Sequence, residues 1–435
     1  MRRRRGRGRA RPRTGAAIGR SGCSCALNFL EQPRGLMMVS NEENVTGLPD
    51  DATVDYVRTG PGTLAGAYMR KFWHPVYVGR KLEAGRAVPL VIMNQKLALY
   101  RSQEGKAHCI DNRCAHRGVM LSTGWVEGDN IRCPYHGWAY DGTGQCVQQP
   151  LEGREFARNV KIGGYPVEEY LGLIFVYLGE GDPPEFPRFP EWEKAKLNVG
   201  IIDVRPCNYF QNVENFQDEG HIWFTHRGSA LEALQLDKLP KLSVERTSWG
   251  LRNVAVTPDG RRREVLFGMP NVGCFLVEPH NTKRAGEESY QAKETAWHHF
   301  AGWRVPVDDH SHLQVHTIGV FLDEEPSPEI IKRWHDFTEA DQVGHELARK
   351  VLEGKLHFDQ IPKLSNHVPM VQDEVVQVGQ GVIPDRRKGV EFLGSSDVAI
   401  VALRKLWVEE LTALKEGRPL RNWHRPEGLV PAAGG

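Results

Sequence analysis

Two short motifs that combine cysteine with histidine constrain this chain of 435 residues more than any other feature. The first reads Arg113-Cys114-Ala115-His116-Arg117-Gly118, and the second reads Arg132-Cys133-Pro134-Tyr135-His136-Gly137-Trp138. A glycine stands within two residues of each histidine, which allows a tight turn there. If all four side chains act together, two loops must meet, and the strand-like residues around them indicate a small β domain that carries both loops.

Together the two loops offer two thiolates and two imidazoles, from Cys114, Cys133, His116 and His136. A Rieske [2Fe–2S] centre uses this set, with the cysteine pair on one iron and the histidine pair on the other. A structural zinc site also takes two Cys and two His, although C-x-H is an unusual first half for zinc. A Cys114–Cys133 disulfide is less favoured, because the eight scattered cysteines fit a reducing cytoplasm. We therefore predict a Rieske centre.

A second constellation lies further along the chain, at Asp218, His221 and His226. Residues three apart share a helix face, so a helix would present Asp218 and His221 together. His226 follows five positions after His221, about 140° round an ideal helix. For both imidazoles to reach one metal, the helix must end, tighten or bulge between them. Two histidines and a carboxylate leave open positions on Fe(II), and we predict a mononuclear iron site here.

Composition describes an ordinary globular protein, with 40% hydrophobic residues and a mean hydropathy of −0.47. No apolar run is long enough to span a membrane. Residues 1–36 hold ten Arg and one acidic residue, whereas the remainder carries a net charge of −8. We expect no nucleic-acid surface on the folded part. Because no G-x-G-x-x-G or P-loop is present, we also expect no nucleotide site in this chain.

The pattern of strands and helices predicts an α+β protein with two folded domains. We expect a disordered or spurious extension at 1–53, a Rieske domain at 54–181, a catalytic domain at 182–420 and a tail at 421–435. Short strands between turns fill the first domain, and residues 182–190 form a Pro-rich linker. Strands are predicted at 252–257, 272–278, 297–305 and 315–321, and helices at 214–226, 329–352, 371–380 and 396–416. Trp303 is assigned to core packing, with the lining of a substrate cavity as the alternative.

Both Cys/His loops resemble the Rieske domain of the aromatic-ring-hydroxylating oxygenases. The Asp218, His221 and His226 spacing matches that family's Asp-x-x-His-x4-His motif. Three further pieces resemble the phthalate-dioxygenase-like branch, namely residues 59–63, 125–129 and 393–397. The respiratory type of Rieske protein carries an extra cysteine in each loop, and the lack of these here favours the oxygenase type.

The resemblance implies a catalytic domain of the helix-grip type and a head-to-tail homotrimer. It also implies that His221 and His226 bind iron. Asp218 would link the iron site to a Rieske histidine of the neighbouring subunit, and Asn215 stands where the family often has an Asn close to the metal.

The carboxylate ligand is less clearly defined by the sequence. Candidates are Asp336, Asp341, Asp359, Asp373 and Glu374. Asp373 is preferred because its segment, 372–380, resembles the family's third-ligand segment and because it is expected to begin a helix that carries a polar stripe. The alternative for Asp373 is a helix N-terminal charge, with Asp341 in reserve.

Taken together, these features predict the oxygenase component of an enzyme that hydroxylates or O-demethylates an aromatic compound with O₂. Its cofactors would be the [2Fe–2S] cluster and a mononuclear Fe(II). Electrons would come from a separate NAD(P)H-dependent reductase, with or without a ferredoxin between them. The alternative is a Rieske electron-transfer or iron-sensing protein without oxygenase activity, which would have no use for the mononuclear site.

Overall fold

The computed structural model describes residues 48–421 except 51, 153, 191, 228–238, 261, 278–297, 323, 340 and 362–367. Nearly all of the predicted extension at 1–53 and all but the first residue of the predicted tail at 421–435 lie outside this range. Within it, no helix is both long and apolar enough to cross a bilayer.

The N-terminal part is built from short antiparallel strands, as the sequence predicts. They form three sheets among the described residues, with the orders β1-β11-β10, β2-β3-β4-β9 and β5-β6-β7-β8. The strands are β1 (Trp73–Val78), β2 (Ala87–Ile92), β3 (Gln95–Arg101), β4 (Ala107–Asp111), β5 (Trp125–Glu127), β6 (Asn130–Arg132), β7 (Ala139–Tyr140), β8 (Cys146–Gln148), β9 (Gly164–Tyr165), β10 (Val167–Tyr170) and β11 (Leu173–Tyr177). The third of these sheets carries the second Cys/His loop between β6 and β7.

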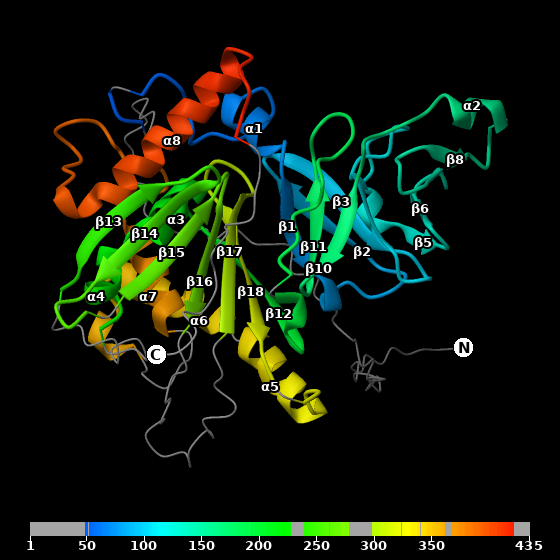
Figure 1. Ribbon diagram of the computed structural model, residues 1–435. Helices are drawn as coiled ribbons and strands as arrows, with labels where there is room; N and C mark the ends of the chain where they lie inside the picture. The colour runs from blue at the N-terminus through cyan, green and yellow to red at the C-terminus, as the bar shows by residue number, and fades with distance from the viewer. Residues whose placement is uncertain are drawn as a thin grey trace, which may run out of the picture. The chain divides into compact units, whose positions relative to one another are not determined.

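The C-terminal part has a larger antiparallel sheet with the order β12-β18-β17-β16-β15-β14-β13. Figure 1 shows this sheet with β13 at the left and β17 and β18 toward the middle of the view. Its strands are β12 (Leu197–Arg205), β13 (Lys241–Arg246), β14 (Gly250–Val256), β15 (Arg262–Gly268), β16 (Val272–Val277), β17 (His298–Pro306) and β18 (His312–Val320). The predicted strands correspond to β14, β16, β17 and β18. β13 to β18 follow one another along the chain, and β12 pairs with β18 at the edge.

Alternation along β17 and β18 gives this sheet two different faces. On one face Trp303 and Val315 pair across the strands and belong to a core that continues into the N-terminal part, where Phe175 packs edge-on against Trp303 at 5.5 Å between ring centroids. The assignment of Trp303 to the core is confirmed. On the other face the paired residues Arg304 and Gln314 are polar and face a helix layer.

Helices form that second layer. They are α3 (Tyr209–Gln217), the 3₁₀ turn η4 (Glu219–His221), α4 (Ile222–Thr225), α5 (Pro328–Glu339), α6 (Asp341–Leu352), α7 (Val368–Gly379) and α8 (Val398–Lys415), while α1 (Leu64–Met69) and α2 (Arg154–Arg158) belong to the N-terminal part. α3 contacts β17 and β18, α8 contacts β13 and β14, and α7 packs on α3, α4 and α6. The predicted helix at 329–352 is divided into α5 and α6.

The Pro-rich segment at 182–190 packs against the core instead of acting as a free linker. Phe186 contacts the rings of Trp73 and Phe175, and Phe189 stacks on Trp192 at 4.7 Å. Backbone hydrogen bonds also join the two parts, from the N–H of Met93 to the C=O of Pro306 at 2.8 Å and by an equivalent bond one residue further on. The observed architecture is the predicted α+β class, whereas the domain boundary at 181/182 stays a prediction.

Candidate functional site

The two Cys/His loops fold in the same way. In each, the cysteine C=O accepts a hydrogen bond from the glycine four residues later, Gly118 at 2.8 Å and Gly137 at 3.1 Å. Each cysteine N–H donates to the carbonyl five residues later, at 2.9 and 2.8 Å. Both glycines have φ near +70°, a conformation that favours glycine. The sequence therefore fixes this turn twice, and each turn presents one cysteine and one histidine.

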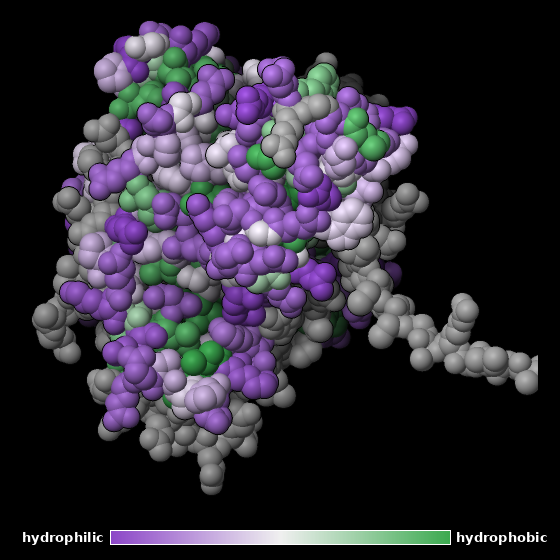
Figure 2. Space-filling model, turned by 90° about the vertical axis from the view of Figure 1, so that its right-hand side faces the viewer, coloured by the Kyte–Doolittle hydropathy of each residue, from purple (hydrophilic) through white to green (hydrophobic). Residues whose placement is uncertain are grey.

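The loops bring the four predicted side chains together, with the sulfurs inside and the imidazoles outside. Cys114 and Cys133 are buried, whereas His116 is exposed and His136 partly so. The two imidazole rings lie 4.4 Å apart between centroids. The face of the molecule toward which β5, β6 and β8 lie is mostly hydrophilic, with hydrophobic residues scattered across it (Figure 2). The histidine side of the loops is thus open to a partner.

This arrangement fits a two-iron cluster better than one zinc ion. Donors to a single ion lie within about 4 Å of one another. Among the described residues, the sets of three donors that all lie within 4.8 Å do not include these four side chains. The cysteine sulfurs also sit among hydrogen-bond donors, with the Tyr140 hydroxyl 3.4 Å from Cys114 Sγ. Burial is the main reason that the pKa of Cys133 is raised, and metal binding would offset that cost.

The second motif lies where the helix after β12 is interrupted. α3 ends at Gln217, and Asp218 adopts an extended conformation with φ −85° and ψ 91°. Its carboxylate then caps η4 by accepting a hydrogen bond from the Gly220 N–H at 2.9 Å. α4 ends at Thr225, immediately before His226. The prediction that the helix ends or tightens before His226 is confirmed, whereas Asp218 and His221 do not share a continuous helix face as expected.

His221, His226 and Asp373 meet at one point. Asp373 Oδ1 lies 3.5 Å from His221 Nε2 and 3.4 Å from His226 Nε2. Donors bound to one ion at about 2.1 Å lie about 3.0–3.5 Å apart, so the set fits a single metal. Both histidines come from the interrupted helix and the carboxylate from α7, so the contact between α4 and α7 assembles the set.

Neighbouring groups orient the three donors. His221 Nδ1 donates to the backbone C=O of Asp218, and His226 Nδ1 lies 3.2 Å from the side-chain oxygen of Gln372. Because each Nδ1 is engaged, each Nε2 is directed at the shared point. The Asn215 amide is 3.4 Å from Asp373 Oδ1, which places it next to the predicted carboxylate ligand. Gln372 was not assigned a role from the sequence, although it stands next to Asp373.

The electrostatics of the set favour bound cations. Burial alone would raise the pKa of Asp373, but the charges of His226, His221 and Arg205 outweigh it and hold that pKa below its ordinary range. For His221, burial lowers the pKa, but the hydrogen bond to Asp373 and the nearby charges raise it by more, so the net shift is upward. Burial lowers the pKa of His226. An ionised carboxylate beside a neutral imidazole is the donor state that a divalent metal needs.

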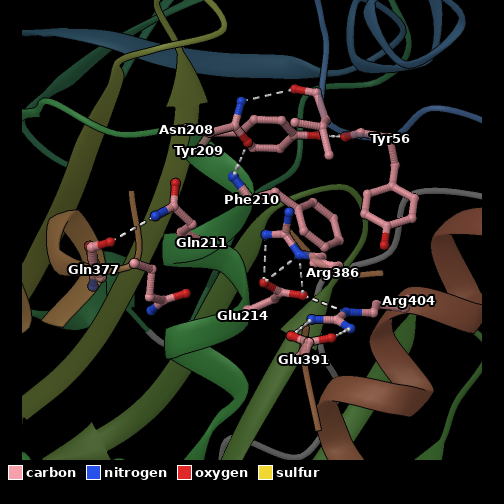
Figure 3. A network of polar contacts seen from close by, with 12 residues as sticks. Tyr56, Asn208, Tyr209, Phe210, Gln211, Glu214, Gln377, Arg386, Glu391 and Arg404 are labelled. Carbon is pink, nitrogen blue, oxygen red and sulfur yellow. Dashed lines mark hydrogen bonds and ion pairs between the residues drawn. The ribbon is translucent and has the colours of Figure 1, made fainter. Parts of the chain in front are cut away.

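A buried ionic network fixes α3, which leads into this motif (Figure 3). Glu214 lies on α3 and is paired with Arg386 at 2.7 Å and with Arg404 of α8 at 2.6 Å. Arg404 also binds Glu391. Burial would raise the pKa of Glu214, but the two guanidinium groups hold it below its ordinary value. Since every charge in the network has a partner, its burial is compensated.

The other carboxylate candidates are differently engaged. Glu374 contacts His345 Nδ1 at 2.6 Å. Asp336 is exposed and paired with Lys332, and Asp359 is exposed. Asp341 begins α6, and its side chain is outside the described part of the chain. Asp373 is therefore the carboxylate that the described fold brings to the histidines.

Asp373 does not begin its helix, which was one of the sequence arguments for it. α7 starts at Val368, so Asp373 lies in the second turn. The reason is that Val368 and Val371 pack into a small core with Ala348 of α6 and extend the helix toward its N-terminus. The same finding removes the alternative, because a residue in the second turn is not an N-terminal helix charge.

A second set of donors includes Glu374, the residue that follows Asp373 on α7. His345 contacts Asp203 Oδ1 at 2.5 Å and Glu374 Oε2 at 2.6 Å, so its two ring nitrogens join two carboxylates. Arg205 donates to the other oxygen of Asp203 at 2.7 Å. Burial lowers the pKa of His345, but the hydrogen bonds to Asp203 and Glu374 raise it to about 10. The set is an internally neutral network that ties α7 to β12 and α6.

The fold and the two donor sets thus define a class, a protein in which a Rieske-like β domain is joined to a sheet-and-helix domain with a two-histidine, one-carboxylate centre. Comparison with known proteins agrees with this class. Residues 72–169 match the Rieske [2Fe-2S] domain.

Relatives match over most of the chain. The 5,5'-dehydrodivanillate O-demethylase oxygenase subunit of Sphingobium sp. (strain NBRC 103272 / SYK-6) is 29% identical, over 83% of this chain and 80% of that protein. The phthalate 4,5-dioxygenase oxygenase subunit of Pseudomonas putida is 27% identical, over 81% and 83%. The terminal oxygenase of carbazole 1,9a-dioxygenase from Nocardioides aromaticivorans IC177 has a similar fold, with a TM-score of 0.58 at 20% identity, over 79% of this chain and 95% of that one. Residues 72–169 thus form a Rieske-type domain, and most of the chain is similar to the oxygenase subunits of enzymes that demethylate or dioxygenate aromatic compounds.

Proposed function

We propose that this chain is the terminal oxygenase of a multicomponent enzyme in which His221, His226 and Asp373 hold the mononuclear iron. The observation that carries the proposal is the convergence of His221 Nε2 and His226 Nε2 on Asp373 Oδ1, at 3.4–3.5 Å. An Fe(II) held by two histidines and one carboxylate supplies adjacent open positions for O₂ and for oxidation of a substrate. A Rieske electron carrier or sensor has no use for such a set, which favours the oxygenase over that alternative.

The protein's own groups prepare the site before any ligand enters. The Asp218 carbonyl and the Gln372 amide engage the Nδ1 atoms of the two imidazoles, so that each Nε2 is directed at the shared point. The Asn215 amide supports Asp373 Oδ1. The network behind α7 resists movement of the carboxylate away from the histidines.

We assign the cluster to Cys114, Cys133, His116 and His136. The matching loops support this assignment, with sulfurs buried and imidazoles at the surface. An exposed imidazole edge is where electrons can enter from a separate reductase or ferredoxin. The sequence has no dinucleotide motif, which is consistent with an external, NAD(P)H-dependent electron source.

We further propose that Asp218 carries electrons between the centres of neighbouring subunits in a head-to-tail homotrimer. Its side chain is partly exposed at the helix break, and its backbone carbonyl contacts His221. Asp218 is thus in contact with a candidate iron ligand on one side and accessible to a neighbouring chain on the other. The described cysteines form no disulfide with one another, which is consistent with the proposed cytoplasmic location.

The substrate we propose is an aromatic compound, which the enzyme hydroxylates or O-demethylates. The relatives support this, since one is named for O-demethylation of dehydrodivanillate and another for dioxygenation of phthalate.

Product analysis tests the proposal. The purified protein is supplied with NADH, a surrogate reductase and a panel of methoxylated and carboxylated aromatics. Oxygen-dependent formation of a hydroxylated or demethylated product is expected, with none from His221→Ala. A protein that keeps its cluster signal and takes up electrons but oxidises nothing in an O₂-dependent way would instead be the carrier.

A further inference from the structure

Arg304, in the middle of β17, is a buried cation with unused hydrogen-bonding capacity. Only 5% of the residue is exposed. Its Nε donates to Asn212 on α3 at 2.9 Å, and its guanidinium lies over the Phe216 ring at 4.5 Å from the centroid. Its Nη1, however, has no hydrogen-bond partner among the described residues. Buried polar groups are rarely left in this state, and a buried charge even less often.

No carboxylate in the described part of the chain is available to neutralise this guanidinium. The charges that act on it are those of Asp373 and Arg205. Asp373 is engaged with the histidine pair, and Arg205 is paired with Asp203. Burial lowers the pKa of Arg304 to about 9, so the group is still a cation at neutral pH. An uncompensated buried charge is costly, and an anionic ligand would remove that cost.

His316, on the neighbouring strand β18, offers a second unused group. It is 6% exposed, and its Nε2 also lacks a partner among the described residues. Burial lowers its pKa well below the ordinary value, so the ring is a neutral hydrogen-bonding group. A Cβ added at Gly302 would lie 2.3 Å from Arg304 Nη1 and 3.3 Å from His316 Nε2. The two unpartnered atoms therefore adjoin one position, the side of Gly302 on which a Cβ would lie.

Aromatic rings adjoin these two groups. Phe216 and Phe300 are partly exposed, nearly parallel at 17°, and 6.4 Å apart between centroids. Phe300 also contacts the His316 ring at 4.5 Å. Phe216 directly follows Asn215, whose amide reaches Asp373, and the charge of Asp373 acts on Arg304, so the guanidinium lies within electrostatic range of a proposed iron ligand. Polar donors next to flat apolar surfaces suit a ligand that has an aromatic ring and an acidic group.

We propose that Arg304 and His316 form an anion subsite that binds the carboxylate of an aromatic acid substrate. The guanidinium would form the charge-assisted bond, His316 Nε2–H would donate a second bond, and the ring would lie against Phe216 and Phe300. This inference rests on the proposed function and narrows its substrate class from aromatic compounds to aromatic carboxylates.

A purely structural role for Arg304 makes a different prediction. If Arg304 is only a support that joins α3 to β17 through Asn212 and Phe216, its loss would weaken the binding of every ligand alike. As an anion subsite, its loss would weaken carboxylates and leave neutral analogues unaffected. Ligand charge, varied at constant shape, therefore separates the two roles.

The experiment is anaerobic titration calorimetry on the iron-loaded protein with matched acid and ester pairs. Benzoate, 3-methoxybenzoate and phthalate are each compared with their methyl esters. At least one acid is expected to bind tenfold or more tightly than its ester. If no acid in the panel is preferred over its ester, the anion subsite is rejected without any variant being needed.

Two Arg→Gln variants locate the preference. Arg304→Gln is expected to weaken the preferred acid at least tenfold and to change ester binding less than twofold. Arg246→Gln, on β13 and already paired with Glu409, is the matched control and should change neither. Equal losses for acid and ester in Arg304→Gln would overturn the proposal. If that variant does not fold, His316→Asn is expected to reduce the acid preference severalfold, and an unchanged preference there would also count against the subsite.

Failure of this inference differs from failure of the proposed function. Iron-dependent oxidation of aromatics without any acid preference would remove only the subsite. If the protein prefers acids but lacks the mononuclear iron, the oxygenase function is rejected and the protein is an aromatic-acid binding protein.

Discussion

The Cys/His loops take all four candidate donors from residues 114–136, whereas the three candidate donors of the catalytic domain come from residues 221–373. Each loop is shaped by its own backbone hydrogen bonds and by one glycine. The His/Asp set depends on the packing of α4 on α7. It also depends on two ionic networks, one that holds α3 through Glu214 and one that holds α7 through Glu374. A centre built from local turns should tolerate distant substitutions, and a centre built from tertiary packing should not.

The largest effect expected is at the connection between the two regions. Asp218→Asn should stop turnover while both metal centres keep their spectra, because the asparagine still caps η4 as Asp218 does. Steady-state turnover and the cluster's EPR signal are the measurements. Normal turnover would remove Asp218 from the electron path.

A smaller but clear effect is expected from the contact that orients His226. Gln372→Leu removes the side-chain oxygen next to His226 Nδ1, and loss of such a contact lowers metal affinity by about 10–100-fold. Competition with a chelator, followed by iron analysis, measures this. Retention of iron equal to that of the unmodified protein would mean that the imidazole is held by packing alone, and cluster iron should be unchanged in any case.

The network behind α7 predicts a pH-dependent loss of stability. The folded pKa of His345 is raised to about 10 from an ordinary 6.5, so its stabilising contribution is complete below pH 6.5 and is lost as the pH rises through about 10. Its side chain is 35% exposed, so solvent screening reduces the contribution to about 1–2 kcal/mol. His345→Gln should lower Tm by about 1–2 °C at pH 7 in a chain of this length.

The control for His345→Gln is the same pair of proteins at pH 10.5, where the difference in Tm should shrink. A difference in Tm that stays constant from pH 6 to pH 10.5 would show that the charge of His345 does not contribute to stability.

The smallest effect is expected within the loops. Tyr140→Phe removes the hydroxyl beside Cys114 Sγ, which also accepts from the Ala115 N–H at 3.1 Å. Hydrogen bonds to cluster sulfurs stabilise the reduced state, so the reduction potential should fall while the cluster remains. Redox titration followed by EPR gives the value. Loss of the cluster in this variant would contradict the view that the loops are fixed by their own backbones.

The same contrast explains what could be predicted from the sequence. The four donors of the Cys/His loops could be predicted because spacing, glycine and turn geometry all act within a few residues. His221 and His226 were readable for the same reason, and the end of the helix before His226 follows from their spacing. The interruption at Asp218 was missed, because an aspartate in mid-pattern gives no strong signal that it will cap a new turn.

Long-range features were predicted less well. The sequence favours Asp373, but one of the arguments for it fails, since α7 starts earlier, at Val368. The pairing of His345 with Asp203 and Glu374 was not anticipated, because these residues are brought together only by the register of β12 and the packing of α6 on α7. Arg304 and His316 were missed for a similar reason. Their relation depends on the pairing of β17 with β18, which the sequence does not specify.

Metal analysis combined with EPR tests the central claim most directly, namely that two separate iron centres are held by the two donor sets. The unmodified protein should contain about three irons per chain and a Rieske signal. His221→Ala should retain about two irons with that signal unchanged, and Cys133→Ala should lose the signal and keep about one. Two irons in the unmodified protein, undiminished in His221→Ala, would contradict the account, and zinc in place of the cluster would contradict it at both sites.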